Sequence, residues 1–206
     1  MSIFTPDINE NNGRMGLIEI KNQKIITPSY VPTKNEFAAL SVTPHVEKKD
    51  YKNAKIGELV SWFDKEQLWK LEHKDGVYNS RKSSFKTDLG GIDASTKIIH
   101  YDFFDDVDNI TIEQLELLLD LQLESGADVI QIPNINKNFD YARVIEKAVA
   151  WKSGKGVNKP LMGVVRKSND LDLLKTKLSV IESIGVNLSS NNRPLLVGVK
   201  NKLKNE

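Results

Sequence analysis

Residues 111–133, TIEQLELLLDLQLESGADVIQIP, predict a helix followed directly by a strand. Thr111 precedes the first apolar turn and Gln114 stands three residues later, which is the spacing of a capping box. Leucines recur at helical spacing up to Gly126, a residue type that commonly ends helices. The β-rich run at residues 127–133 then predicts a short buried strand. This helix–strand pair indicates one unit of a parallel α/β fold.

The same alternation continues towards the C-terminus. Further helices are expected at residues 139–152 and 170–184, with Gly185 ending the second of them. Further strands are expected at residues 160–165 and 194–199. All these strands are short and apolar without strict alternation, as in sheets covered on both faces. The pattern therefore predicts several consecutive parallel β/α units.

The N-terminal part of the chain predicts a small antiparallel unit. Residues 17–20 and 24–31 are β-rich and are separated by a polar connection, so they predict a hairpin. Residues 57–71 have apolar positions compatible with a helix, and residues 79–84 read as a polar loop with a small basic cluster. Residues 85–88 predict a short strand that ends at a Leu-Gly-Gly sequence.

Composition excludes several kinds of site. The chain has 29 Lys and Arg against 28 Asp and Glu, a net charge of +1. The charge of the whole chain therefore gives no support to a strongly basic nucleic-acid binder, although a local basic patch stays possible. Cysteine is absent, which excludes disulfides, thiolate zinc sites and a cysteine nucleophile, and three histidines give little basis for a metal site. No apolar run approaches the roughly 20 residues that span a bilayer, and no signal peptide is visible. We expect a cytoplasmic protein with no metal, cofactor or membrane partner.

Candidate site residues follow from the expected strand order. Parallel α/β folds carry their sites at the carboxyl ends of the strands, a rule that selects Asp88, Asn134 and Arg166. Gly90 and Gly91 follow Asp88 and could bring backbone N–H groups close to a ligand. The amide of Asn134 could pair with the edge of a planar heterocycle, and Arg166 could bind a phosphate.

Each candidate also has a structural alternative. Asp88 could cap a turn before the two glycines, Asn134 could form an Asx turn, and Arg166 could lie in solvent. Spacing alone favours these alternatives. The four aspartates within residues 102–108 lack the spacing of an EF-hand loop, so this stretch predicts a solvated loop.

Four short motifs occur in order along the chain. The first is GRMGL at residues 13–17, followed by IITPSYVP at 25–32; the second is TDLGG at 87–91. The third runs from ITIE through ESGADVI over residues 110–130, and the fourth is PLMGVV at 160–165. Together they resemble the tRNA-guanine transglycosylases, particularly the archaeal branch that initiates archaeosine formation. The second motif is similar to the T-D-S-G-G/S motif of that family.

The resemblance implies a (β/α)8 TIM-barrel-like parallel barrel with an N-terminal β-hairpin, here partial or shortened, over a single domain of residues 1–206. It also implies exchange of a guanine base in tRNA for a 7-deazaguanine. By position, Asp88 would be an active-site acid or base, and Asn134 falls near the base-recognising aspartate of the family. The positions that would bind substrate are Gly90, Gly91, Asn134, Gly163 and Arg166.

Several features of the family are missing from this sequence. Ile92 and Asp93 replace an aromatic residue and a glutamine, and RKS at residues 166–168 replaces a Q-G-G sequence. Three further features of the family have no recognisable counterpart in this sequence. They are the last barrel strands with the nucleophilic aspartate, the zinc site and the RNA-binding extensions. We therefore expect tRNA as a partner and association with a second chain, either another copy or a complementary transglycosylase chain. The alternatives are a non-catalytic relative that binds RNA or a catalytic paralogue, and an unrelated α/β protein with chance motifs.

Overall fold

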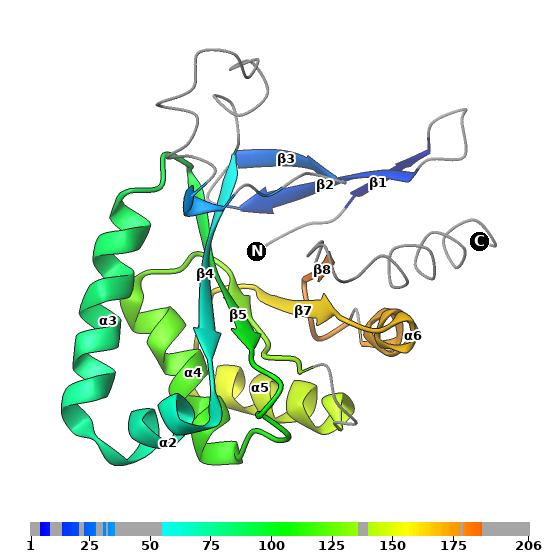
Figure 1. The fold of residues 1–206 in the computed structure, drawn as a ribbon. Coiled ribbons are helices and arrows are strands. Elements are labelled where there is room, and N and C mark those ends of the chain that lie inside the picture. Colours follow the sequence, from blue (N-terminus) through cyan, green and yellow to red (C-terminus); the bar gives the residue numbers. More distant parts are fainter. Residues whose placement is uncertain are drawn as a thin grey trace.

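Parallel strands followed by helices form the larger part of a mixed α/β fold (Figure 1). The structure is a computed structural model that describes residues 5–8, 14–20, 23–27, 31, 33–35, 55–135, 140–177 and 179–186. The strands are β1 (Thr5–Ile8), β2 (Arg14–Ile20), β3 (Gln23–Thr27), β4 (Ile56–Phe63), β5 (Thr96–Phe103), β6 (Ile130–Gln131), β7 (Leu161–Val165) and β8 (Ser183–Val186). The helices are α2 (Lys65–His73), α3 (Asp75–Gly90), α4 (Ile112–Ser125), α5 (Tyr141–Lys155) and α6 (Ser168–Thr176).

The parallel strands lie in two small sheets. One sheet pairs β4 with β5, and the other has the order β6-β7-β8. A parallel bridge between Ile98 and Val129 joins the two sheets, and the N–H of Asp128 donates to the carbonyl of Lys97 across the same junction. The described strands β4 to β8 are therefore parallel and follow one another in chain order, but they do not close into an eight-stranded barrel.

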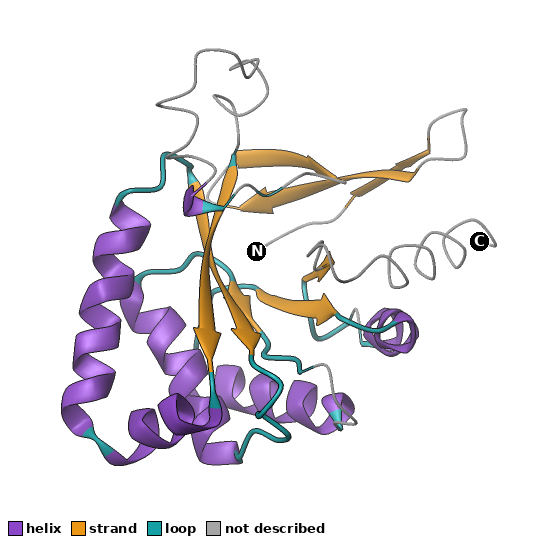
Figure 2. Cartoon of the chain, viewed as in Figure 1, coloured by secondary structure: helices purple, strands orange, loops and turns teal. Residues whose placement is uncertain are grey.

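The two faces of these strands are covered differently. Helices α3, α4 and α5 lie along one face (Figure 2), where Leu59, Phe63 and Tyr101 belong to the main core. The opposite face, called the inner face below, has a smaller apolar cluster at the amino ends of the strands. Its buried members are Ile20, Ile56, Ile98 and Val129, with Met162 packed against them. Successive strand residues alternate between these two faces.

The N-terminal hairpin is confirmed. Strands β2 and β3 pair antiparallel, and β1, which the sequence did not predict, adds a third strand beside β2. This sheet lies across the amino ends of β4 and β5 (Figure 1), where Ile20 packs against Ile56 and Ile98. The N-terminal sheet thus covers the end of the parallel strands opposite to the end where sites in such folds usually lie.

The helix expected from Thr111 is confirmed with both halves of its capping box. The Thr111 hydroxyl accepts from the backbone N–H of Gln114 at 3.1 Å, and the Gln114 carbonyl oxygen accepts from the N–H of Thr111 at 3.1 Å. Gly126 caps the other end with a φ of 95°, the left-handed region that favours glycine. The strand at residues 160–165 and the helix expected at 139–152 are also confirmed as β7 and α5, with small shifts in their ends.

Other expectations were wrong. Residues 57–71 hold most of strand β4 and of helix α2 instead of one helix, because Asp64 ends the strand and caps α2 through a capping box with Gln67. The expected loop at 79–84 and strand at 85–88 both belong to helix α3. The helix expected at 170–184 ends at Thr176. Its expected terminator, Gly185, lies within β8, and residues 194–199 are outside the described residues.

Within the described residues, none of the helices combines the length and the apolar character that crossing a membrane requires.

Candidate functional site

Four buried polar residues gather on the inner face at the carboxyl ends of β5, β6 and β7. They are His100, Asp102, Gln131 and Arg166, exposed by 7%, 6%, 0% and 4%, and they are called the polar cluster below. The alternation of β5 places His100 and Asp102 on the same face as Ile98 of the inner apolar cluster. Each strand thus carries apolar residues near its amino end and polar residues near its carboxyl end, the distribution expected of a ligand-binding end.

An ion pair between Asp102 and Arg166 forms the centre of the polar cluster. Their Oδ1 and Nη1 atoms are 2.5 Å apart, and the two side chains are only 8% and 2% exposed. The Nη2 atom of Arg166 also donates to the backbone carbonyl of Tyr101 at 2.9 Å. Arg166 therefore reaches from the end of β7 across β6 to β5, and it ties the two parallel sheets together at their carboxyl ends.

Gln131 replaces a regular sheet hydrogen bond between β5 and β6. Its side-chain oxygen accepts from the N–H of Tyr101 at 2.8 Å, while its own backbone N–H and carbonyl bond to the amide of Gln122 on α4. Among the residues that the structure describes, two buried donors of the polar cluster have no hydrogen-bond partner, namely Nε2 of Gln131 and Nε of Arg166. Because an unpaired buried donor costs free energy, these two groups have capacity for a ligand with acceptor atoms.

His100 is uncharged at neutral pH. Burial and, to a smaller extent, the neighbouring Arg166 guanidinium lower the pKa of His100 from 6.5 to about 4, although Asp102 acts in the opposite direction. The polar cluster thus contains one cation, one anion and a neutral imidazole, so it is suited to a ligand without a large net charge.

A second group of hydrogen bonds fixes the backbone beyond β7. The Oδ2 atom of Asp170 accepts from the N–H groups of Arg166 and Lys167 and from Nδ2 of Asn134, each at 2.9 Å. Asn134 Nδ2 also donates to the carbonyl of Val164 at 2.8 Å. The structure therefore brings Asn134 close to Arg166, as expected, but both amide hydrogens of Asn134 are used in holding the backbone.

Asp88 does not lie at a strand end. It occupies the last turn of helix α3, where its Oδ1 atom pairs with Nζ of Lys34 at 2.5 Å. The carbonyl of the next residue, Leu89, accepts from Nζ of Lys97 at the start of β5. Asp88 is therefore at the amino end of the sheet, roughly 15–20 Å along β5 from Asp102. The expectation that it joins Asn134 and Arg166 was wrong, because the chain from Asp75 to Gly90 forms a helix running back along the strands.

The three candidate glycines, Gly90, Gly91 and Gly163, lie where the local fold accounts for them. Gly90 is the last residue of α3, and Gly91 caps that helix with its N–H directed at the carbonyls of Asp88 and Leu89. Gly163 lies in β7, and a Cβ atom at this position would be 2.3 Å from Cδ2 of Leu174 on α6. Gly163 thus faces the covering helix instead of the inner face, and its small size allows α6 to pack closely.

Gly163→Ala is expected to lower the free energy of unfolding by about 1–3 kcal/mol, because the added methyl group overpacks the contact with Leu174. Urea denaturation followed by circular dichroism measures this change. Gly154→Ala is the control: Gly154 lies in α5 with open space around its Cβ position, so alanine there should be neutral or slightly stabilising. Equal stability of Gly163→Ala and the natural chain would contradict this packing role.

The sequence did not single out Asp102 or Gln131. Asp102 belongs to the stretch of four aspartates for which the sequence predicts a solvated loop, but it is the buried penultimate residue of β5. A period-two pattern of Ile98, His100 and Asp102 within an apolar run was the available signal, since it places a carboxylate on the face shared with an isoleucine.

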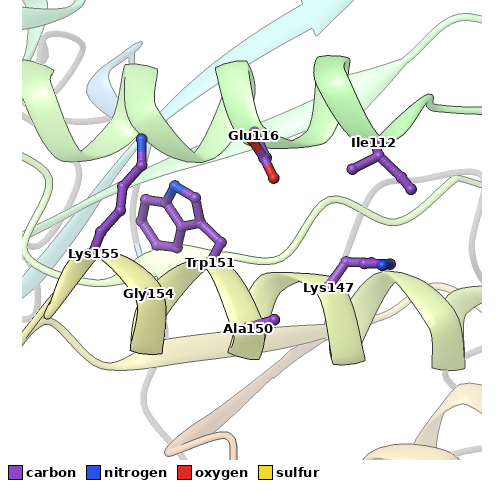
Figure 3. A pocket seen from close by; sticks show the side chains of 7 residues that line it. All are labelled: Ile112, Glu116, Lys147, Ala150, Trp151, Gly154 and Lys155. Atoms are coloured by element: carbon purple, nitrogen blue, oxygen red, sulfur yellow. The ribbon is translucent and has the colours of Figure 1, made fainter.

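A groove of about 310 Å³ lies between the outer surfaces of α4 and α5 (Figure 3). Trp151 and Lys155 of its lining both bond to Asp120, the former through Nε1 at 3.0 Å and the latter through Nζ at 2.6 Å. Since α4 and α5 cover the face opposite to the polar cluster, this groove is separate from the candidate site.

No protein-family model matches the sequence of this chain, and no curated protein matches it significantly. The choice between functions therefore depends on the geometry of the polar cluster and on the chemistry that its groups allow.

Proposed function

We propose that the chain is a tRNA-guanine transglycosylase-like protein whose polar cluster binds the edge of a guanine-type base. The observation that carries this proposal is the buried Asp102–Arg166 pair at the carboxyl ends of β5 and β7. It is accompanied by two buried donors that have no partner within the described part of the chain. Buried polar groups that lack partners are costly, so their position at the end of a parallel sheet supports a binding role.

The groups of the polar cluster complement the edge of guanine. A guanine base offers N–H donors at N1 and N2 and acceptors at O6 and N7. The carboxylate of Asp102 can only accept, whereas Nε of Arg166 and Nε2 of Gln131 can only donate. The cluster therefore supplies both kinds of partner that a base edge needs, and the uncharged state of His100 adds no second positive charge.

The strand order supports the scaffold part of the proposal. Five described parallel strands follow one another in chain order, each connected to the next by one or two helices, which fits an arc of a (β/α)8-type barrel. Base exchange also needs a carboxylate that attacks the ribose C1′ as the bond from C1′ to guanine breaks, and a second group that supplies a proton to the leaving guanine. Asp102 is the single carboxylate of the polar cluster and is already paired, so we propose that a second chain completes the catalytic site.

A non-catalytic scaffold is the second candidate. The position of Asp88 favours it, because the residue matching the acid/base of the family lies at the amino end of the sheet and pairs with Lys34. In that case the chain would bind a base, tRNA or a catalytic paralogue without carrying out exchange.

The test compares two matched substitutions at the opposite ends of the sheet. Equilibrium dialysis with radiolabelled guanine measures binding by the natural chain, by Asp102→Asn and by Asp88→Asn. Loss of one charge-assisted hydrogen bond, worth about 1.5–3 kcal/mol, is expected to weaken binding to Asp102→Asn by roughly tenfold to a hundredfold. Asp88→Asn is expected to bind guanine like the natural chain. Circular dichroism confirms that each variant is folded.

The outcomes separate the candidates. Weakened binding to Asp88→Asn with full binding to Asp102→Asn would overturn the role of the polar cluster, and absence of binding by the folded natural chain would overturn base binding altogether. Incorporation of radiolabelled guanine into tRNA by the chain alone would contradict the need for a second chain. Guanine binding without incorporation is the expected result for the isolated chain.

A further inference from the structure

An aromatic pair lies at the carboxyl ends of β4 and β5. Trp62 is the penultimate residue of β4 and Phe104 directly follows β5; their ring centroids are 5.2 Å apart and their planes are inclined by 42°. The two residues are 47% and 49% exposed, which is unusual for large hydrophobic residues in the described part of the chain. The carbonyl of Phe63 accepts from the N–H of Phe104 at 3.0 Å, so the backbone holds the two rings side by side.

Trp62 adjoins the polar cluster directly. It is paired in register with Asp102, and neighbouring residues of a parallel pair direct their side chains to the same face. Burial agrees with this placement, because Phe63 on the opposite face is fully buried in the main core. The exposed indole therefore lies beside the carboxylate that Arg166 pairs with, at the boundary between solvent and the buried cluster.

We propose that the Trp62–Phe104 pair stacks the uncharged ring of a free purine-type base or its nucleoside, and that the edge of this ring faces the polar cluster. This inference rests on the proposed function in one respect: the base that stacks on the aromatic pair is the base whose edge the polar cluster binds. Aromatic faces stack on any of the bases, whereas hydrogen-bonding groups select among the bases by their edges. The rings thus provide the contact area, and Asp102, Arg166 and Gln131 provide the selectivity.

The charges around the aromatic pair favour an uncharged ligand over a phosphorylated one. Asp105 and Asp106 follow Phe104 and are exposed, and Asp64 follows the end of β4. Asp106 Oδ2 accepts from the backbone N–H of Lys65, which fixes this carboxylate beside the start of α2. Asp64, Asp105 and Asp106 are acidic and only Lys65 is basic; these four residues are called the acidic rim below. A phosphate group beside the aromatic pair therefore meets net negative charge.

The experiment is equilibrium dialysis of the full chain with tritiated guanosine, adenosine and guanosine 5′-monophosphate. Trp62→Ala is expected to weaken guanosine binding by about tenfold or more, because the stacked face is lost. Trp62→Phe retains an aromatic ring and is expected to recover most of the affinity. Trp69→Ala is the matched control, because Trp69 is also 47% exposed but stacks on His73 of α2, and it is expected to leave binding unchanged. The monophosphate should bind about fivefold more weakly than guanosine at low salt, and the difference should shrink as salt is added.

The results distinguish this inference from the proposed function. If both nucleosides bind through Trp62 but Asp102→Asn has no effect, stacking stands and guanine recognition by the cluster fails. If guanosine binding depends on Asp102 and not on Trp62, the proposed function stands and stacking is overturned. Unchanged nucleoside binding by Trp62→Ala together with an altered oligomeric state would overturn stacking and assign the aromatic pair to a protein interface. Preference for the monophosphate would overturn the role of the acidic rim.

Discussion

Asp102→Ala is expected to lower the free energy of unfolding by about 3–5 kcal/mol, which is the usual cost of removing one partner of a buried ion pair. The substitution leaves the guanidinium of Arg166, whose side chain is 2% exposed, without its anion. One hydrogen bond from Arg166, to the carbonyl of Tyr101, would remain, but a neutral carbonyl does not balance the charge. Urea denaturation followed by circular dichroism measures the loss.

The control for this prediction is an exposed ion pair in the same chain. Lys82 pairs with Glu124 at 2.9 Å, with side chains 33% and 46% exposed, so Glu124→Ala should cost at most about 1 kcal/mol. The double substitution Asp102→Ala with Arg166→Met should be less destabilising than the sum of its single substitutions, because it removes both charges. A cost below about 1 kcal/mol for Asp102→Ala alone would show that the pair is accessible to water.

Local signals in the sequence were sufficient for the elements with complete caps. Helix α4 begins and ends where its capping box and its glycine predict, because both motifs satisfy backbone groups within one turn of the helix. The same type of signal was present at Asp64 and Gln67, where D-x-x-Q marks the start of α2. Residues 57–71 resemble a single helix in sequence, because apolar positions on both sides of Asp64 continue one helical stripe.

The sequence does not predict helix α3, because the residues of this helix have low helix propensity. It contains glycine, asparagine, serine and threonine at several interior positions, all of low helix propensity. Burial of Phe85 and Leu89 against the strands stabilises it, and this tertiary contribution cannot be seen in a local pattern. Glycine pairs follow the ends of strands and the ends of helices alike. The sequence TDLGG at residues 87–91 therefore does not distinguish a strand from a helix.

The candidate site depends on contacts between distant parts of the chain. Arg166 is predicted at a strand end and lies there. The period-two pattern of β5 can place Asp102 on the inner face, but its pairing with Arg166 follows only from the positions of β5 and β7 on either side of β6. Gln131 likewise becomes a site residue through a backbone N–H on the neighbouring strand. The rule that sites lie at carboxyl ends of parallel strands was therefore useful, whereas the choice of residues required the strand order and register.

Phe63→Ala is expected to destabilise the chain by about 3–5 kcal/mol, the usual cost of truncating a buried phenylalanine. Phe63 is 0% exposed at the end of β4, and its ring meets Tyr101 edge-on with centroids 5.3 Å apart. The guanidinium of Arg81 on α3 lies 5.0 Å from the same ring, so the substitution also removes a cation–π contact. The loss is measured by urea denaturation, as for Asp102→Ala.

The adjacent residue gives a sharp comparison, because Trp62 lies on the opposite face of β4 and is 47% exposed. Trp62→Ala should change the free energy of unfolding by less than about 1 kcal/mol while weakening nucleoside binding, since exposed side chains contribute little to stability. Phe63→Ala should do the reverse at temperatures where it remains folded, leaving the affinity for guanosine within about twofold of the natural value. If Trp62→Ala were the more destabilising variant, the two faces of β4 would be exchanged and the indole could not form part of a ligand site.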